Sequence, residues 1–274
     1  MGYSTNAYLF CFYFSSFIVS LFVSVELYTV AWNPVMISIG SCVGMLSVLL
    51  MIVTAKAIRS GPVGVTFAFQ NASAVFPVLL LFLVFGQDFG FMLTTAQIVG
   101  MGLIILGLFL AAVRKNNDNK RASIKWLQYV IACFLVQMVI LTIFHWRCLL
   151  FKTEYPSHML IPCTFPEAED VWFMPSFFGM ASLFQGILLC TKKKIPEARE
   201  IMYGLLGGIA NSGSTTLLLL ATKWALPLEK GLLFPCFAVS VILLSNLWER
   251  LLYKAYVDVR TIILCSAGVI LGSF

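Results

Sequence analysis

The sequence predicts an all-α membrane protein that crosses the bilayer several times. Hydrophobic residues make up 60% of its 274 residues and charged residues only 11%, whereas about 25% of the residues in a typical soluble domain are charged. The apolar residues are gathered into segments of about 20 residues, the length that an α-helix needs to cross a hydrocarbon core roughly 30 Å thick. Together these observations exclude an ordinary soluble domain.

Nine apolar segments are long enough to cross the membrane as helices. They cover residues 7–30, 34–55, 62–86, 93–113, 126–146, 171–191, 200–222, 228–248 and 257–274. The six tryptophans fall at or near the ends of these segments, at Trp32, Trp126, Trp146, Trp172, Trp224 and Trp248. Indole rings favour the headgroup region of a bilayer, so the tryptophans support the segment boundaries.

Basic residues between the segments predict which loops face the cytoplasm. The connections around 56–61, 114–125, 192–199 and 249–260 hold two, five, four and three Lys and Arg residues, 14 of the 18 in the chain. Cytoplasmic loops are enriched in Lys and Arg, so we expect these loops and the N-terminus to be inside and the C-terminus outside. The same rule accounts for the net charge of +6, and no nucleic-acid partner is expected.

The sequence also predicts an internal repeat. A shift of about 164 residues lays the first four segments on the last four, and places the pair Gly40 and Gly44 on the pair Gly204 and Gly208. The unpaired segment 126–146 separates the two sets, so the sets would cross the membrane in opposite senses. Such an inverted repeat is typical of secondary transporters, whose binding site lies near the bilayer midplane between the repeats.

No motif in the sequence predicts catalysis, a metal site or a cofactor. The patterns H-E-x-x-H and G-x-S-x-G and the phosphate-binding P-loop are absent, and neither His145 nor His158 has a nucleophile beside it. The eight cysteines form no C-x-x-C pair. We therefore expect neither an enzyme nor ATP-driven transport by this chain. Cys148 and Cys163 lie in a loop expected outside, where a disulfide and two free thiols are both open alternatives.

Amide and hydroxyl side chains inside the apolar segments are the candidate substrate-binding residues. Such groups cost free energy in lipid and must face protein or a water-filled cavity. The set is Asn71, Asn211, Ser212, Gln70, Gln137 and Gln185. The same residue types also hold transmembrane helices together by hydrogen bonds, and this alternative stays open.

Glu26 is the one carboxylate that lies inside an apolar segment and more than two residues from either end of it. It is about a turn from the expected outer end of the first segment, where an ionised side chain can reach the headgroup region. The alternative is that Glu26 faces the cavity, where it would take up a proton or bind a substrate amine.

Two hairpins of the sequence carry a resemblance to a known family. The stretches are 69–77, 85–88, 97–100 and 103–107 in the first hairpin, and Phe234–Pro235, Trp248–Arg250 and Gly268–Gly272 in the second. On these stretches the chain resembles the drug/metabolite transporter superfamily, specifically its EamA-like members. The resemblance implies a secondary carrier of ten helices in two repeats, with a central cavity for small organic solutes. We accordingly expect a multi-pass protein of the bacterial inner membrane.

The chain departs from the family pattern in two ways. It has nine predicted helices, so the N-terminal repeat, residues 1–115, would lack its first helix, and the C-terminal repeat would cover residues 116–274. The charge pattern also places the C-terminus outside, whereas the ten-helix members keep both termini inside. The missing helix would leave one flank of the N-terminal repeat unpaired, and two alternatives stay open: a homodimer that covers the flank, or an inactive chain.

The expected function is secondary-active transport of a small neutral or zwitterionic metabolite by alternating access. The near absence of charged residues at the midplane argues against a strongly anionic solute, which Lys or Arg would normally meet. The expected partners are a small-molecule substrate and the lipid bilayer. Two alternatives stay open: a non-transporting membrane scaffold or interaction protein, and a passive channel.

Overall fold

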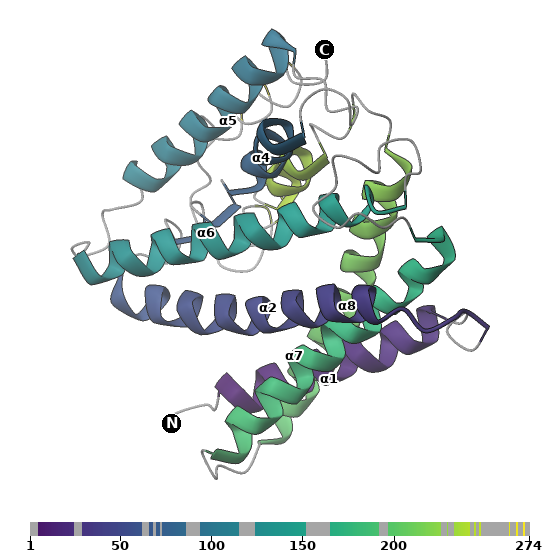
Figure 1. The fold of residues 1–274 in the computed structure, drawn as a ribbon. Helices are drawn as coiled ribbons and strands as arrows, with labels where there is room; N and C mark the ends of the chain where they lie inside the picture. The colour runs from purple at the N-terminus through teal and green to yellow at the C-terminus, as the bar shows by residue number, and fades with distance from the viewer. Residues whose placement is uncertain are drawn as a thin grey trace. The chain divides into compact units, whose positions relative to one another are not determined.

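The structure is a computed structural model of the whole chain. It describes residues 5–24, 29–61, 66–67, 70–71, 73–85, 94–114, 124–151, 165–191, 197–225, 229, 233–241, 244, 247, 263, 267 and 271. The described residues form helices and turns, and no strand occurs among them (Figure 1). The labelled α-helices are α1 (Thr5–Val23), α2 (Pro34–Ser60), α4 (Phe76–Phe85), α5 (Thr95–Arg114), α6 (Ile124–Arg147), α7 (Phe173–Thr191) and α8 (Ala198–Trp224). Two short 3-10 helices, η2 (Ser73–Val75) and η5 (Glu167–Trp172), precede α4 and α7.

Five of the described helices are long and apolar enough to cross a membrane. They run over Asn6–Val23, Pro34–Ser60, Ile124–Arg147, Glu167–Thr191 and Ala198–Trp224. Each coincides with one of the predicted segments, so the prediction of an all-helical, multi-pass membrane protein is confirmed. The count of nine helices and the inverted repeat stay predictions.

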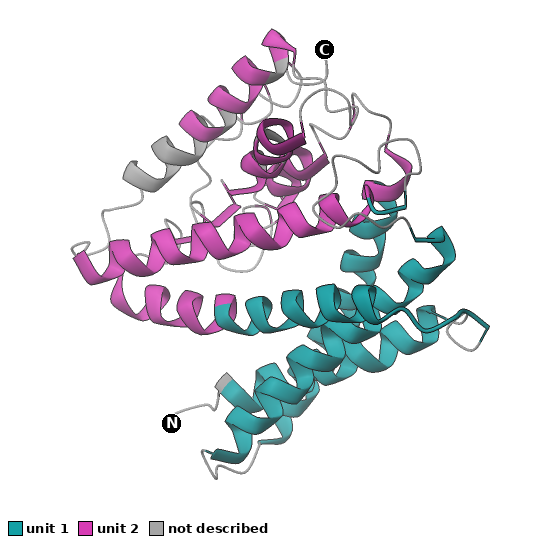
Figure 2. Cartoon of the chain, in the orientation of Figure 1, with its two compact units in different colours: residues 1–49, 150–153, 163–221 teal, residues 50–149, 154–162, 222–274 magenta. Residues whose placement is uncertain are grey.

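The chain folds as two compact units (Figure 2). Unit 1 comprises residues 1–49, 150–153 and 163–221, and unit 2 comprises residues 50–149, 154–162 and 222–274. Unit 1 therefore contains α1, α7, most of α8 and the first part of α2, whereas unit 2 contains α4, α5 and α6. These units are defined by contacts and do not test the expected repeats, residues 1–115 and 116–274, which stay a prediction.

Glycines set the close approach of α2 to α7 within unit 1. A Cβ atom added at Gly40 would lie 2.6 Å from the carbonyl oxygen of Phe173, and one added at Gly44 would overlap the carbonyl oxygen of Phe177. No side chain fits at either position without moving the backbone of α7. The two glycines, one helical turn apart, thus let the two helices meet backbone to backbone.

The second glycine pair performs the same role between α1 and α8. A Cβ atom at Gly204 would lie 2.8 Å from the carbonyl oxygen of Tyr8, and one at Gly208 would overlap the carbonyl oxygen of Phe12 and the hydroxyl of Ser15. The glycine pairs that the sequence aligned therefore both mark tight helix contacts, α2 with α7 and α8 with α1.

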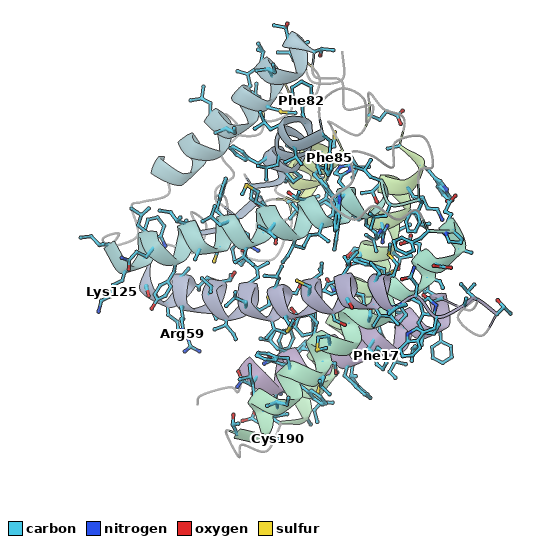
Figure 3. The ribbon with its side chains drawn as sticks, in the orientation of Figure 1. Phe17, Arg59, Phe82, Phe85, Lys125 and Cys190 are labelled. Atoms are coloured by element: carbon cyan, nitrogen blue, oxygen red, sulfur yellow. The ribbon has the colours of Figure 1, made fainter. Side chains whose placement is uncertain are left out.

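Helices α1 and α7 pack antiparallel through aromatic side chains of α1. The ring of Phe10 lies beside Gly186, and the ring of Phe17 beside Gly179, each 3.1 Å from the position of an added Cβ atom. Phe17 is labelled on α1 in Figure 3. Since the contacts run in opposite directions along the two helices, the N-terminal end of α1 meets the C-terminal end of α7.

An asparagine closes the other end of unit 1. The side-chain oxygen of Asn33 accepts hydrogen bonds from the backbone N–H groups of Val35 (2.9 Å) and Met36 (3.0 Å), as an N-cap does. Its amide nitrogen donates to the carboxylate of Glu169 in η5 at 2.5 Å. The start of α2 is therefore fastened to the segment that leads into α7.

Candidate functional site

Three helices of unit 1, namely α1, α7 and α8, contact one another pairwise. Asn6 of α1 donates to the carbonyl oxygen of Leu188 at 3.4 Å, at the end of α7. Ser16 of α1 donates to the carbonyl oxygen of Gly208 in α8 at 2.8 Å. Thr216 of α8 donates to the sulfur of Met174 in α7 at 3.5 Å. The three helices therefore share an interior, and the polar side chains in this interior form the candidate site.

Gln185 of α7 lies at one end of this interior. Its side chain is 0% exposed, and its amide nitrogen donates to the carbonyl oxygen of Asn6 at 3.5 Å. Its amide oxygen is buried and has no hydrogen-bond partner among the described residues. A buried acceptor in this state costs about 1–3 kcal/mol unless a ligand or water supplies a donor.

Ser212 of α8 lies toward the other end. It is 0% exposed, and its hydroxyl finds no partner within the described part of the chain. The neighbouring Asn211 is half-buried and donates from its amide nitrogen to the hydroxyl of Ser16 at 3.5 Å. The structure therefore brings three of the predicted residues, Gln185, Asn211 and Ser212, to the three-helix packet of unit 1.

Tyr13 is a member of this group that sequence reasoning missed. It is 2% exposed, and its hydroxyl also has no partner among the described residues. Tyr13 follows Phe10, which contacts α7, by three positions and precedes Ser16, which contacts α8, by three, so it lies on the face of α1 between the two contacts. The available signal was a tyrosine in the middle of an apolar segment, where its hydroxyl needs a partner.

The interior of these helices carries no ionisable Asp, Glu, Lys, Arg or His. None occurs in α1, in α7 or in residues 201–222 of α8, all of which the structure describes. The charged residues of α8 lie at its ends, where Glu200 accepts from the backbone N–H of Glu197 at 3.1 Å as in a capping box. Glu200 is itself buried, so neutral hydrogen bonding is the available chemistry along residues 201–222 and not at the start of α8.

Gln70 and Asn71 belong to unit 2 and lie at an interruption of the predicted helix 62–86. Residues 70 and 71 are helical, whereas Ser73–Val75 form a 3-10 turn before α4 begins at Phe76. Ser73 donates from its hydroxyl to the carbonyl oxygen of Gln70 at 2.6 Å. The expectation of one continuous helix is wrong here, because a 3-10 turn divides it.

The side chains of Gln70 and Asn71 are bonded locally. The hydroxyl of Thr54 in α2 donates to the amide oxygen of Gln70 at 3.3 Å and lies 3.4 Å from the sulfur of Cys133 in α6. Asn71 donates to the carbonyl oxygen of Phe67, one turn earlier, at 2.9 Å. These contacts match the alternative in which amides hold helices together.

The remaining predicted residues are not among those that the structure brings to the site. Gln137 lies within α6 of unit 2 and is half-buried. Glu26, the candidate for proton or substrate coupling, lies outside the described residues, as does Cys163. Cys148 carries a free thiol that donates to the hydroxyl of Thr222 at 3.6 Å and to the carbonyl oxygen of Phe144 at 3.8 Å, and its sulfur accepts from Arg147 at 3.9 Å.

Comparison with known proteins adds no relative. No family model matches the chain, and no curated protein matches it. The resemblance to EamA-like transporters therefore stays a prediction that rests on the stretches named above.

Proposed function

We propose that the chain is a secondary-active carrier that moves a small organic solute, neutral or zwitterionic, by alternating access. The observation that supports this most is the set of buried polar atoms without described partners on Tyr13, Gln185 and Ser212. They come from three helices that share one interior, and each of these helices is long and apolar enough to cross a membrane.

A helix bundle with a purely structural role would avoid buried polar atoms that have no hydrogen-bond partner. Each unpaired buried donor or acceptor costs about 1–3 kcal/mol, and apolar side chains of similar size would remove that cost. Natural proteins retain such unfavourable groups mainly where function requires them. Three in one helix packet are therefore better explained by a solute or water that binds there than by packing.

The rival function, a membrane scaffold, has an observation of its own in its favour. Gly40, Gly44, Gly204 and Gly208 serve tight helix contacts, and Ser15 and Ser16 bond to backbone carbonyl oxygens of α8 at 3.1 and 2.8 Å. These groups need no solute. A scaffold, however, gives Ser212 and Gln185 no role, and a passive channel is distinguished from a carrier because it shows no counterflow.

The proposal includes the location of the protein in the cell. We place it in the bacterial inner membrane as a multi-pass protein, as the EamA resemblance implies. A homodimer is part of the same proposal.

Counterflow in proteoliposomes tests this function. Vesicles that contain the purified chain are loaded with a mixed pool of amino acids, nucleosides, sugars and cofactors, and exchanged species are followed by mass spectrometry. We expect selective exchange of one class of solute. Ser212→Ala should reduce the exchange rate by about tenfold, which corresponds to the roughly 1.4 kcal/mol of one lost hydrogen bond.

Ser214→Ala is the matched control. Ser214 lies two positions along the same helix, is exposed, and donates to the carbonyl oxygen of Asn211 at 3.0 Å. Exchange should survive this change. Thermal unfolding of the Ser212→Ala protein should occur at the same or a higher temperature, because an unpaired hydroxyl has been removed. Absence of exchange by the folded wild-type protein would contradict the carrier.

A further inference from the structure

We propose that the solute is uncharged and rich in hydroxyl groups, a small polyol or sugar, and that it binds inside unit 1 along Gln185, Tyr13 and Ser212. The claim that this solute is transported rests on the proposed function. The claim that it binds depends only on the residues inside the three helices.

The register of the helices arranges the three groups in a row. Gln185 contacts the backbone of Asn6, Tyr13 lies seven positions further along α1, and Asn211, beside Ser212, contacts Ser16. Asn6 and Ser16 are ten positions apart on α1, about 15 Å at 1.5 Å per residue. The row is therefore long enough for a solute with several hydrogen-bonding groups.

The chemistry of the three unpaired atoms selects the complementary groups. The amide oxygen of Gln185 can only accept, whereas the hydroxyls of Tyr13 and Ser212 can both donate and accept. The amide nitrogen of Gln185 faces a carbonyl oxygen, which fixes the orientation of the amide because two oxygens would not bond. A solute hydroxyl can donate to Gln185 and can satisfy either of the other two.

Glu200 is buried at the start of α8, where it accepts from the backbone N–H of Glu197, and the absence of charge in the interior beyond it argues against a zwitterion. No Asp, Glu, Lys, Arg or His occurs in the described helices α1 and α7 or in residues 201–222 of α8. A buried ammonium or carboxylate needs an opposite charge or a dense set of hydrogen bonds to offset the loss of its hydration. An amino acid would bring one of each into a site that offers three neutral groups, whereas a polyol brings no charge.

Equilibrium binding to the purified full chain in lipid nanodiscs tests the proposal without any transport step. The probes are radiolabelled sorbitol and glucose, with glutamine as a zwitterion of similar size. We expect saturable binding of sorbitol or glucose and none of glutamine. Tyr13→Phe, which removes only the hydroxyl, should weaken that binding by about tenfold.

Tyr203→Phe provides the matched control, because Tyr203 lies on α8 and is 59% exposed. It should leave binding unchanged. Binding of glutamine in place of the polyols would overturn the inference while leaving a carrier possible in counterflow. Binding of a polyol without counterflow would uphold the inference and defeat the proposed transport. If no polyol bound to the folded protein, or if Tyr13→Phe bound as well as wild type, the inference would be overturned.

Discussion

Hydroxyl groups inside unit 1 fall into two kinds. One kind holds helices together by hydrogen bonds, and the other is available to the candidate site. Ser15 and Ser16 each donate to carbonyl oxygens in their own helix and in α8, so they are satisfied within the protein. Tyr13 and Ser212 are equally buried but have no partner among the described residues. Only the second kind has its hydroxyl donor left for a solute.

Glycines at two positions of α8 should respond in opposite ways to the same substitution. In Gly208→Ala the new methyl group would overlap the backbone of α1 at Phe12, whereas at Gly213 nothing lies within 4 Å of an added Cβ atom. Overpacking costs about 1–3 kcal/mol, while alanine in an open helical position gains about 0.5–1 kcal/mol over glycine. Gly208→Ala should therefore lower the midpoint of thermal unfolding in detergent, and Gly213→Ala should leave it unchanged or raise it.

Equal midpoints for the two variants would show that the contact between α1 and α8 is not as tight as the structure has it. Gly102→Ala is a control for the effect of the substitution itself, since an added Cβ atom there also meets nothing within 4 Å.

At residue scale, two of the three buried groups could be predicted from the sequence, and the reason that the third was missed is physical. Gln185 and Ser212 stood out because amides and hydroxyls are rare in apolar segments. Tyr13 did not, because a tyrosine adds mostly apolar surface and reads as part of an aromatic run. Asn71 stood out equally, yet its amide is bonded to Phe67 in its own turn. Whether an amide is satisfied locally depends on rotamers and partners, which composition does not contain.

At the scale of elements, the division of the 62–86 segment follows from one proline. Pro77 has no N–H to give to the carbonyl oxygen four positions earlier, that of Ser73, and its ring crowds that carbonyl. The chain forms a 3-10 turn over Ser73–Val75 instead, and the hydroxyl of Ser73 bonds to the carbonyl oxygen of Gln70. The apolar run predicted a helix of the right length but concealed this interruption.

Pro77→Ala should allow a continuous α-helix through the interruption. The new N–H can bond to the carbonyl oxygen of Ser73, which removes part of the roughly 3 kcal/mol that a proline costs inside a helix. Amide hydrogen exchange over residues 73–78 should slow by about tenfold or more, since opening would then break an added helical hydrogen bond. Mass spectrometry of peptides from this region measures the change.

Pro34→Ala serves as the control for that experiment. Pro34 is the first residue of α2, a position where the N–H has no partner within the helix, so proline is tolerated there. Its replacement should leave exchange in residues 73–78 unaltered. Unchanged exchange in Pro77→Ala as well would mean that the turn does not depend on the proline.

At the scale of the whole molecule, helix ends that the distribution of Lys and Arg predicts on the cytoplasmic side meet within each unit. In unit 2 the end of α2 meets the start of α6, where Gly61 packs on Trp126, and Arg59 and Lys125 project at that same end (Figure 3). In unit 1 the start of α1 meets the end of α7, which the basic residues 192–194 follow in the sequence. In each unit, described helix ends that the sequence assigns to the cytoplasmic side thus meet one another.

The fold class and five of the spans were predictable because they depend on the length and apolar content of single segments. The nine-helix count and the inverted repeat depend on how segments pair, and low similarity between the halves leaves glycines as the main guide. Those glycines mark tight contacts in both places. The shift that lays 7–30 on 171–191 and 34–55 on 200–222 also exchanges the two helix pairs, α2 with α7 and α8 with α1. Pairing of this kind is decided by side-chain fit across helices.

The most direct test of the central claim, that the interior of unit 1 opens to water and solute, is thiol labelling of Ser212→Cys in membranes. A small charged methanethiosulfonate reagent is applied from each side in turn, and modified peptides are identified by mass spectrometry to separate them from native cysteines. Leu217→Cys is the control, because Leu217 lies on the same helix and is 69% exposed on its outside, where lipid would exclude a charged reagent. We predict that Ser212→Cys is labelled from both sides, that bound solute slows the reaction, and that Leu217→Cys stays unlabelled. A folded Ser212→Cys protein that reacts from neither side would contradict an interior that opens.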